Sequence, residues 1–104
     1  KCEKLLNKTL SNQSRLFRPP YGRINKTQLS ELDKEHKTVL WDYLIGDFDS
    51  NLSKNECFNR AKKSIRNGDV VVLHDNLKSF ETMQYVLPKI LTHFSNLGYR
   101  FEAI

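Results

Sequence analysis

The chain has 104 residues, the length of one small domain, and 28% of them are charged. Hydrophobic residues make up 38% and aromatic residues 11%, which excludes a disordered, a collagen-like or a membrane-spanning protein. The 17 lysines and arginines outnumber the 12 acidic residues and leave a net charge of +5. Because the basic residues are scattered, we interpret this excess as a solvated surface; an anionic partner such as nucleic acid is the alternative.

Strand and helix patterns alternate along the chain. The first half predicts four elements in order: a helix at Glu3–Leu10, a strand at Arg15–Phe17, a helix at Thr27–Glu35 and a strand at Thr38–Tyr43. The second half predicts two helices and two strands, with the strands at Asp69–His74 and Tyr99–Ile104. This order predicts an α/β fold with parallel strands joined by right-handed crossovers, as an open sheet or as part of a barrel.

The two helices of the second half carry the clearest local signals. Ser53 and Glu56 form a capping box, which predicts a helix start, and apolar residues follow on one face: Cys57, Phe58, Ala61 and Ile65. The other helix has a longer apolar stripe of Phe80, Met83, Leu87, Ile90, Leu91 and Phe94. Pro88 within this stripe predicts a kink or a later helix start.

The two cysteines, Cys2 and Cys57, lack the spacing of a zinc site. The two cysteines could form one disulfide or remain two free thiols. They therefore do not indicate whether the protein works in an oxidising or a reducing compartment.

Polar residues gather where three of the predicted strands end. Arg18–Gly22 follows the first strand, Asp42–Asp49 the second, and His74–Asp75 the third. Each cluster also has a purely structural interpretation. The first could be a rigid turn, the second a loop with a helix cap, and the third a buried histidine. The carboxyl ends of parallel strands share one rim, where sites of α/β folds form. Together the clusters predict one site in which a cation, a carboxylate and an acid–base imidazole meet.

These residues resemble the last three motifs of a known enzyme family. Leu16–Gly22, Trp41–Phe48 and Val72–Asp75 are similar to the Arg-x-Pro-Tyr, Asp-x-x-Asp-Trp and Leu-x-His motifs of the polysaccharide deacetylases, the NodB-homology enzymes of carbohydrate esterase family four. The motifs occur in the family's order and at similar separations, and the resemblance covers the chain from Leu16 onward. It implies roughly the second half of an irregular (β/α) barrel.

The resemblance also implies an activity. The family members are metal-dependent hydrolases that remove N- or O-linked acetyl groups from polysaccharides, with a divalent metal, commonly zinc, as cofactor. The implied partner is an acetylated polysaccharide or oligosaccharide, without nucleic acid and without a membrane segment. The implied location is the cell envelope or another extracytoplasmic site.

Four residues take catalytic roles by their positions in the motifs. His74 matches the acid that protonates the leaving amine or alcohol, and Asp47 matches the aspartate that orients this histidine. Arg18 matches the arginine that pairs with the catalytic base, and the backbone N–H of Tyr21 matches an oxyanion donor. Substrate contacts are implied for Pro20, Tyr21, Phe48 and Val72.

The sequence departs from the family pattern in two ways. Leu44 replaces the first aspartate of its motif, Phe48 replaces the tryptophan, and Val72 replaces a leucine. The family's Asp-Asp pair and His-x-x-x-His motif, which supply the base and the metal ligands, do not occur in the sequence. We therefore expect residues 1–104 to be the carboxyl-terminal part of a single deacetylase domain, inactive as this fragment, with its metal ligands outside this chain.

Two other functions stay open on the sequence alone. The chain could be a degenerate, non-catalytic relative that binds glycans, or a small basic α/β protein that binds nucleic acid.

Overall fold

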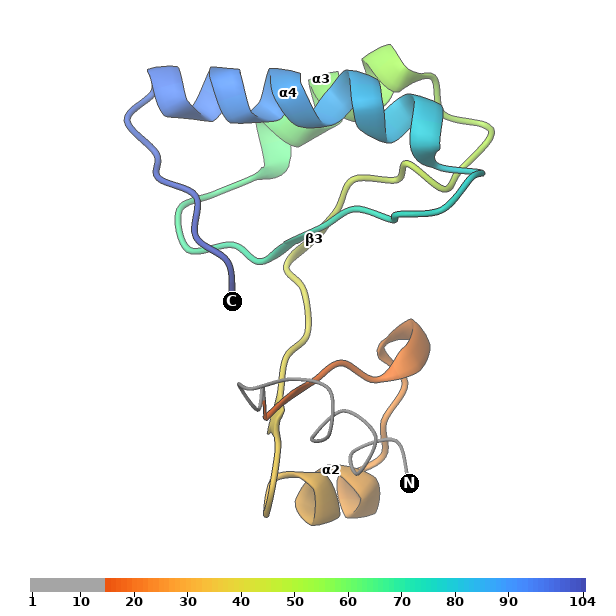
Figure 1. The fold of residues 1–104 in the computed structure, drawn as a ribbon, viewed down its shortest axis with the longest axis vertical. Coiled ribbons are helices and arrows are strands. Elements are labelled where there is room, and N and C mark those ends of the chain that lie inside the picture. The colour runs from red at the N-terminus through yellow and green to blue at the C-terminus, as the bar shows by residue number, and fades with distance from the viewer. Residues whose placement is uncertain (1–14) are drawn as a thin grey trace, which may run out of the picture. The chain divides into compact units, whose positions relative to one another are not determined.

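The computed structural model describes residues 15–104, so the helix expected at Glu3–Leu10 and the residue Cys2 lie outside the described residues. The chain divides after Leu40 into two units, which we consider separately. Short strands and helices alternate along both of them (Figure 1). No helix among the described residues is long and apolar enough to cross a membrane.

The described part of the first unit, from residue 15 onward, contains a parallel strand pair and a helix. The elements described there are β1 (Leu16–Phe17), the 3-10 turn η1 (Pro20–Gly22), α2 (Lys26–Leu32) and β2 (Lys37–Thr38). Leu16 lies opposite Lys37 in the parallel register of β1 and β2. Helix α2 begins at a reciprocal capping box, in which Asn25 and Gln28 accept each other's backbone N–H. The helix expected at Thr27–Glu35 is thus confirmed, with its end three residues earlier.

The second unit places a parallel strand pair beside two helices. Its elements are β3 (Tyr43–Leu44), α3 (Lys54–Ser64), β4 (Val71–Val72) and α4 (Phe80–Asn96). Tyr43 lies opposite Val71, and Leu44 opposite Val72. Because the strands are parallel, the loops that follow β3 and β4 leave from the same edge. The predicted class, a partial α/β fold with parallel strands alternating with helices, is confirmed.

The prediction of a single strand at Thr38–Tyr43 is wrong, because the two ends of this segment pair with different strands. The backbone N–H of Val39 donates to the carbonyl of Phe17 at 2.8 Å, as part of the first unit. The N–H of Tyr43 donates to the carbonyl of Val70 at 3.2 Å, in the second unit. The segment therefore forms β2 and β3, which belong to separate sheets.

Two more strand predictions require correction. The strand expected at Asp69–His74 is paired only at Val71–Val72. The alternating segment Tyr99–Ile104 forms no strand, and residues 100–104 are exposed. Alternation alone does not make a strand: the backbone groups need a neighbouring strand, and the described residues offer none at this position.

Both predicted helices of the second unit form. The capping box of α3 is confirmed, with the Ser53 N–H donating to Glu56 Oε2 at 2.8 Å and the Glu56 N–H donating to Ser53 Oγ at 3.2 Å. The Glu56 carboxylate accepts hydrogen bonds from the backbone N–H of Ser53 and from its hydroxyl, and these two bonds, the backbone one foremost, lower the pKa of Glu56. Helix α4 runs through Pro88 with two turns on its amino-terminal side, so a start at Pro88 is wrong.

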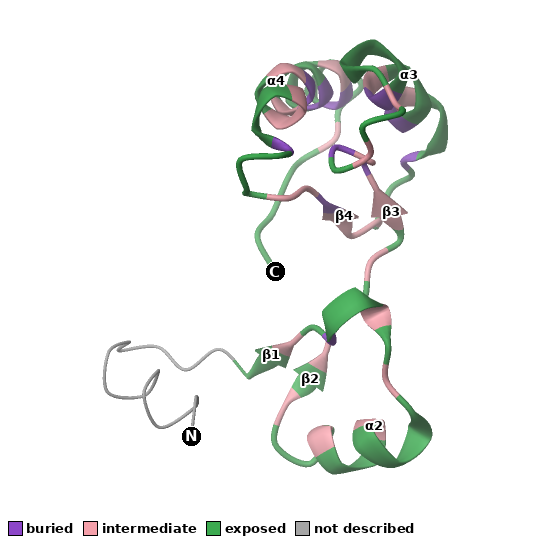
Figure 2. Cartoon of the chain, turned by 90° about the vertical axis from the view of Figure 1, so that its right-hand side faces the viewer, coloured by how far each residue is buried: buried purple, intermediate pink, exposed green. Residues whose placement is uncertain are grey.

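The core of the second unit lies where α3 and α4 approach the β3–β4 pair, as the buried segments in Figure 2 show. Its buried members are Ile45, Cys57, Ala61, Ile65, Val86, Ile90 and Phe94. Two residues of the predicted α4 stripe, Phe80 and Leu91, are instead exposed by 47% and 38%. Val86, which the stripe omitted, is fully buried in their place.

We expect Phe94→Ala to lower the free energy of unfolding of this unit by about 3–5 kcal/mol, because it empties a buried aromatic site. Phe94 is 3% exposed and its ring packs edge-to-face on Tyr99 with centroids 5.1 Å apart. Denaturation by urea measures the change. Leu77→Ala is the matched control, since Leu77 is 97% exposed and its truncation should stay within about 0.5 kcal/mol of zero. Equal losses in both variants would contradict this core assignment.

Candidate functional site

The register of β3 and β4 brings Asp47 and His74 to the same edge of their sheet. Leu44 and Val72 are paired, and Asp47 follows Leu44 by three residues while His74 follows Val72 by two. Two of the three polar clusters expected at strand ends therefore meet in the structure.

Asp47 binds His74 through both of its carboxylate oxygens. Oδ1 lies 2.9 Å from Nδ1 of the imidazole, and Oδ2 accepts the backbone N–H of His74 at 2.6 Å. The Asp47 side chain is fully buried, whereas the His74 side chain keeps 33% of its surface exposed. The buried Asp47 carboxylate thus fixes the imidazole ring on its Nδ1 side, and part of the ring remains exposed to solvent.

This pairing determines which ring nitrogen can react. With Asp47 accepting at Nδ1, that nitrogen carries a proton, and Nε2 remains for an external partner. No hydrogen bond engages Nε2 within residues 15–104. An imidazole oriented in this way can deliver a proton to a leaving group or take one from it.

Phe48 and Val72 differ in what they offer beside the histidine. The Phe48 ring meets the His74 ring edge-to-face, with centroids 5.0 Å apart and planes 72° apart, and Phe48 is 41% exposed. Val72 is only 7% exposed. Phe48 therefore presents an apolar surface next to the imidazole, whereas Val72 is buried and exposes little surface.

Two residues for which the sequence predicted no role at the site, Gly46 and Cys57, lie at the turn before Asp47. Gly46 has φ +81°, and a Cβ there would lie 3.1 Å from Leu52 Cδ1, so the turn favours glycine. The thiol of Cys57 lies 3.7 Å from the Gly46 carbonyl. Burial raises the pKa of the Cys57 thiol, and the charge of Asp47 adds to the increase. The signal available in the sequence was the glycine directly before the aspartate.

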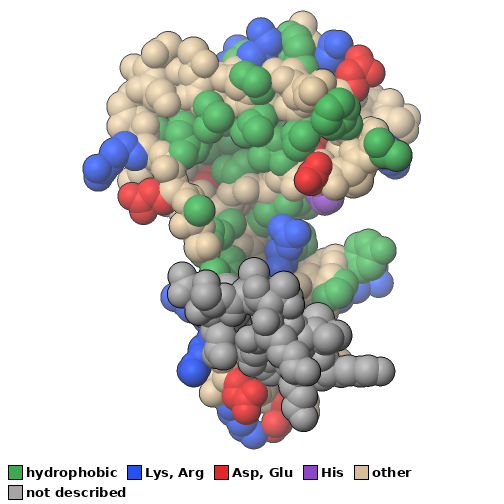
Figure 3. Space-filling view, viewed as in Figure 1, with side chains coloured by type: hydrophobic (Ala, Val, Ile, Leu, Met, Phe, Trp, Pro, Cys, Tyr) green, Lys and Arg blue, Asp and Glu red, His purple; other side chains and the backbone are tan. Residues whose placement is uncertain are grey.

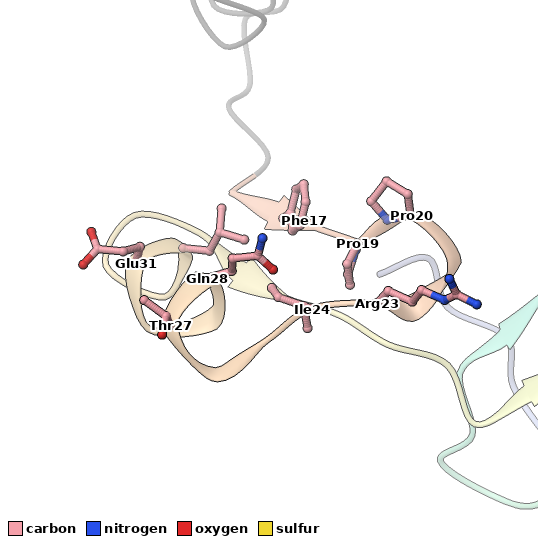
Figure 4. Close-up of a pocket in the computed structure, with 9 residues that line it drawn as sticks. Phe17, Pro19, Pro20, Arg23, Ile24, Thr27, Gln28 and Glu31 are labelled. Atoms are coloured by element: carbon pink, nitrogen blue, oxygen red, sulfur yellow. The ribbon is translucent and has the colours of Figure 1, made fainter.

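The remaining predicted site residues, Arg18, Pro20 and Tyr21, belong to the first unit. Tyr21 is 90% exposed and has a left-handed backbone with φ 56°, which is uncommon for a residue other than glycine. Pro20 lines a cavity of about 460 Å³ together with Phe17 and Arg23 (Figure 4). The catalytic and substrate-binding roles of the predicted residues in both units stay predictions.

The described residues do not fit a metal ion by themselves. No group of three or more histidine, cysteine, aspartate or glutamate side chains in residues 15–104 is arranged to hold one. Asp47 and His74 hold each other, which leaves a pair and not a ligand set.

An α/β fold with a histidine–carboxylate pair at the strand ends suits a hydrolase, and known proteins of this class match the chain. No family model matches. A bifunctional xylanase/deacetylase of Pseudobutyrivibrio xylanivorans is 29% identical over 90 residues, which are 86% of this chain and 14% of that protein. A peptidoglycan-N-acetylglucosamine deacetylase of Bacillus cereus is 33% identical over 91 residues, 86% of this chain and 43% of that protein.

A solved structure shares the fold. It is a peptidoglycan N-acetylglucosamine deacetylase in complex with 4-naphthalen-1-yl-N-oxidanyl-benzamide, with a TM-score of 0.74 and 23% identity, covering 96% of this chain and 47% of that one. The chain is thus a relative of the polysaccharide deacetylases, as its motifs predicted, and it spans less than half the length of the relatives it matches.

Proposed function

We propose that this chain is the acid-bearing part of a metal-dependent polysaccharide deacetylase that hydrolyses N- or O-linked acetyl groups. The observation that carries the proposal is the buried Asp47 carboxylate bound to both the backbone and the ring of His74. The relatives, which are named as deacetylases of peptidoglycan or as xylanase/deacetylase, support the substrate class and suggest the cell envelope as the location.

In this proposal His74 is the general acid. As the bond between the acetyl carbon and the sugar nitrogen or oxygen breaks, Nε2 gives its proton to the departing atom, so that a neutral amine or alcohol leaves. Asp47 is the positioning residue, because it holds the ring by Nδ1 and stabilises the charge of the protonated imidazole. Phe48, whose ring lies against that of His74, and Val72 are the apolar residues that line the acetyl group in this proposal.

The first unit contributes the other proposed roles. Arg18 orients the catalytic base, and the backbone N–H of Tyr21 donates to the oxygen that becomes negative as the tetrahedral intermediate forms. Pro20 and the exposed Tyr21 ring contact the sugar. The base and the ligands of the divalent metal, zinc in this proposal, lie outside residues 15–104, so we derive no step through the metal.

The test is acetate release from an acetylated chito-oligosaccharide with Zn²⁺ or Co²⁺ supplied. We expect release by the complete polypeptide that contains this sequence and none by residues 1–104 alone, because the described residues hold no metal ligand set. Release by residues 1–104 alone would contradict the placement of the metal ligands. Glycan binding without acetate release by the complete polypeptide would contradict the enzyme and favour a degenerate glycan-binding relative.

A further inference from the structure

A cluster of lysines and aromatic rings lies on the surface of α3 and α4, and the proposed deacetylase reaction does not use it. Lys62 Nζ lies 4.6 Å from the centroid of the Phe58 ring, and Lys54 Nζ lies 5.3 Å from that of Tyr85. Lys89 Nζ lies between the two rings, 4.8 Å from Tyr85 and 5.9 Å from Phe58. We call these five residues the lysine–aromatic cluster.

The helical repeat explains how the cluster forms. Lys54, Phe58 and Lys62 follow one another at four-residue intervals along one face of α3. Tyr85 and Lys89 have the same spacing on α4, which packs directly against α3. The hydroxyl of Tyr85 donates to Asn55 Oδ1 at 3.0 Å and ties the two faces together. Figure 3 shows basic side chains along the outer rim of this helical layer.

The cluster carries more positive charge than its neighbours neutralise. Lys54 pairs with Glu81 at 3.2 Å, but Lys62 and Lys89 make no ion pair within the described part of the chain. Glu56, the carboxylate of α3 itself, lies two residues from both Lys54 and Phe58, away from their face of the helix, and is occupied by the capping box with Ser53. Two ammonium groups thus stay available to an anion while the ring faces hold them in place.

The two unpaired ammonium groups constrain the kind of anion. Lys62 and Lys89 come from different helices and both lie over the Phe58 ring, 4.6 and 5.9 Å from its centroid, so the anionic groups that bind them are held close together. Each ring has two ammonium groups over it, so its faces are not free to stack on a nucleic-acid base. A polymer that carries anionic groups but no planar bases fits both observations.

We propose that the lysine–aromatic cluster is a second binding site, which holds a polyanionic glycan through carboxylate or phosphate groups spaced along its chain. The choice of a glycan rests on the proposed function, which already brings the protein to a polysaccharide. The site is distinct from the Asp47–His74 pair, because none of its five residues contacts either of them through a hydrogen bond or a ring. It would anchor the polymer while another part of it is processed.

Binding of polygalacturonate, measured by calorimetry at low salt, tests the site without using activity. Lys62→Gln/Lys89→Gln should weaken binding by roughly 10-fold or more. It should also reduce the slope of log affinity against log salt concentration by about two, since each ammonium contact releases about one counterion. The control Lys26→Gln/Lys37→Gln removes the same charge from exposed lysines of the first unit and should leave affinity nearly unchanged. Lys62→Arg/Lys89→Arg should bind as the wild type does, which excludes misfolding as the cause of a loss.

Several outcomes would overturn this proposal. Equal losses in the two Gln variants would assign binding to net charge, and equal binding of neutral dextran would remove the role of charge. Tighter binding of single-stranded DNA or of phosphatidylserine vesicles would assign the surface to another class of partner. Because this test measures binding and not acetate release, its failure would leave the deacetylase proposal intact. In the same way, absence of acetate release would leave the measured polyanion binding intact.

Discussion

His74→Ala is expected to lower kcat for acetate release from an acetylated chito-oligosaccharide by about 10²–10⁴-fold. The sugar nitrogen is a poor leaving group unless it is protonated, and His74, which Asp47 holds through Nδ1 and the backbone N–H, is the proposed acid. The side chain is one-third exposed, so its removal opens no cavity in the core and the variant should fold. Steady-state kinetics of the complete, metal-supplied polypeptide measure the loss.

A second substrate separates acid catalysis from a structural role. 4-Nitrophenyl acetate has a leaving group that departs without a proton, so His74→Ala should slow its hydrolysis far less than that of the chito-oligosaccharide. His74→Gln keeps an amide near Asp47 but cannot donate a proton, and it should be as slow as the alanine variant on the sugar. Equal losses on both substrates, or wild-type kcat on the sugar, would show that His74 is not the acid.

Asp47→Asn should also lower kcat strongly, by up to about 10⁴-fold if the histidine adopts the wrong tautomer, as in a serine protease with the same substitution. The carboxylate accepts two hydrogen bonds, from the backbone N–H of His74 at 2.6 Å and from its ring at 2.9 Å. An asparagine has one oxygen for these two donors, so one of them must face an amide NH₂. The same mismatch should lower the free energy of unfolding by about 1–3 kcal/mol, because the side chain is fully buried.

Asp49→Asn is the matched control for this substitution, two residues along the same loop. Asp49 Oδ1 accepts the backbone N–H of Asn51 at 2.9 Å, and an asparagine oxygen can do the same. Both kcat and the free energy of unfolding should stay near wild type. If Asp47→Asn lost stability but kept its kcat, Asp47 would be a structural residue only, and the proposed orientation of His74 would be wrong.

Local features were predicted well from the sequence because their causes are local. The capping box of Ser53 and Glu56 joins residues three apart, and its hydrogen bonds form in any context that permits the helix. Spacing along α3 placed Cys57 and Ala61 in the core for the same reason. The motif residues Asp47 and His74 were identified by their order and types, and the structure joins them by contacts of 2.6 and 2.9 Å.

Strand pairing could not be predicted from the sequence, because it depends on which backbone groups meet. The segment from Thr38 to Tyr43 has the composition of one strand, yet Val39 pairs with Phe17 and Tyr43 with Val70. The segment at Tyr99–Ile104 alternates like a strand but lacks a neighbour among the described residues. Burial on α4 followed the same rule: contact with α3 and the strands, not hydrophobicity, put Val86 inside and left Phe80 half exposed.

The order and types of the motif residues predicted the relationship to the polysaccharide deacetylases and singled out the histidine and aspartate that form the pair. Only the tertiary structure decided that Asp47 uses both oxygens on His74 and that lysines of α3 and α4 converge on two shared rings. Residue types and spacing are properties of the chain and survive in any conformation. Contacts across 27 residues, or between two helices, exist only after the register of β3 and β4 and the packing of α3 on α4 have brought those residues together.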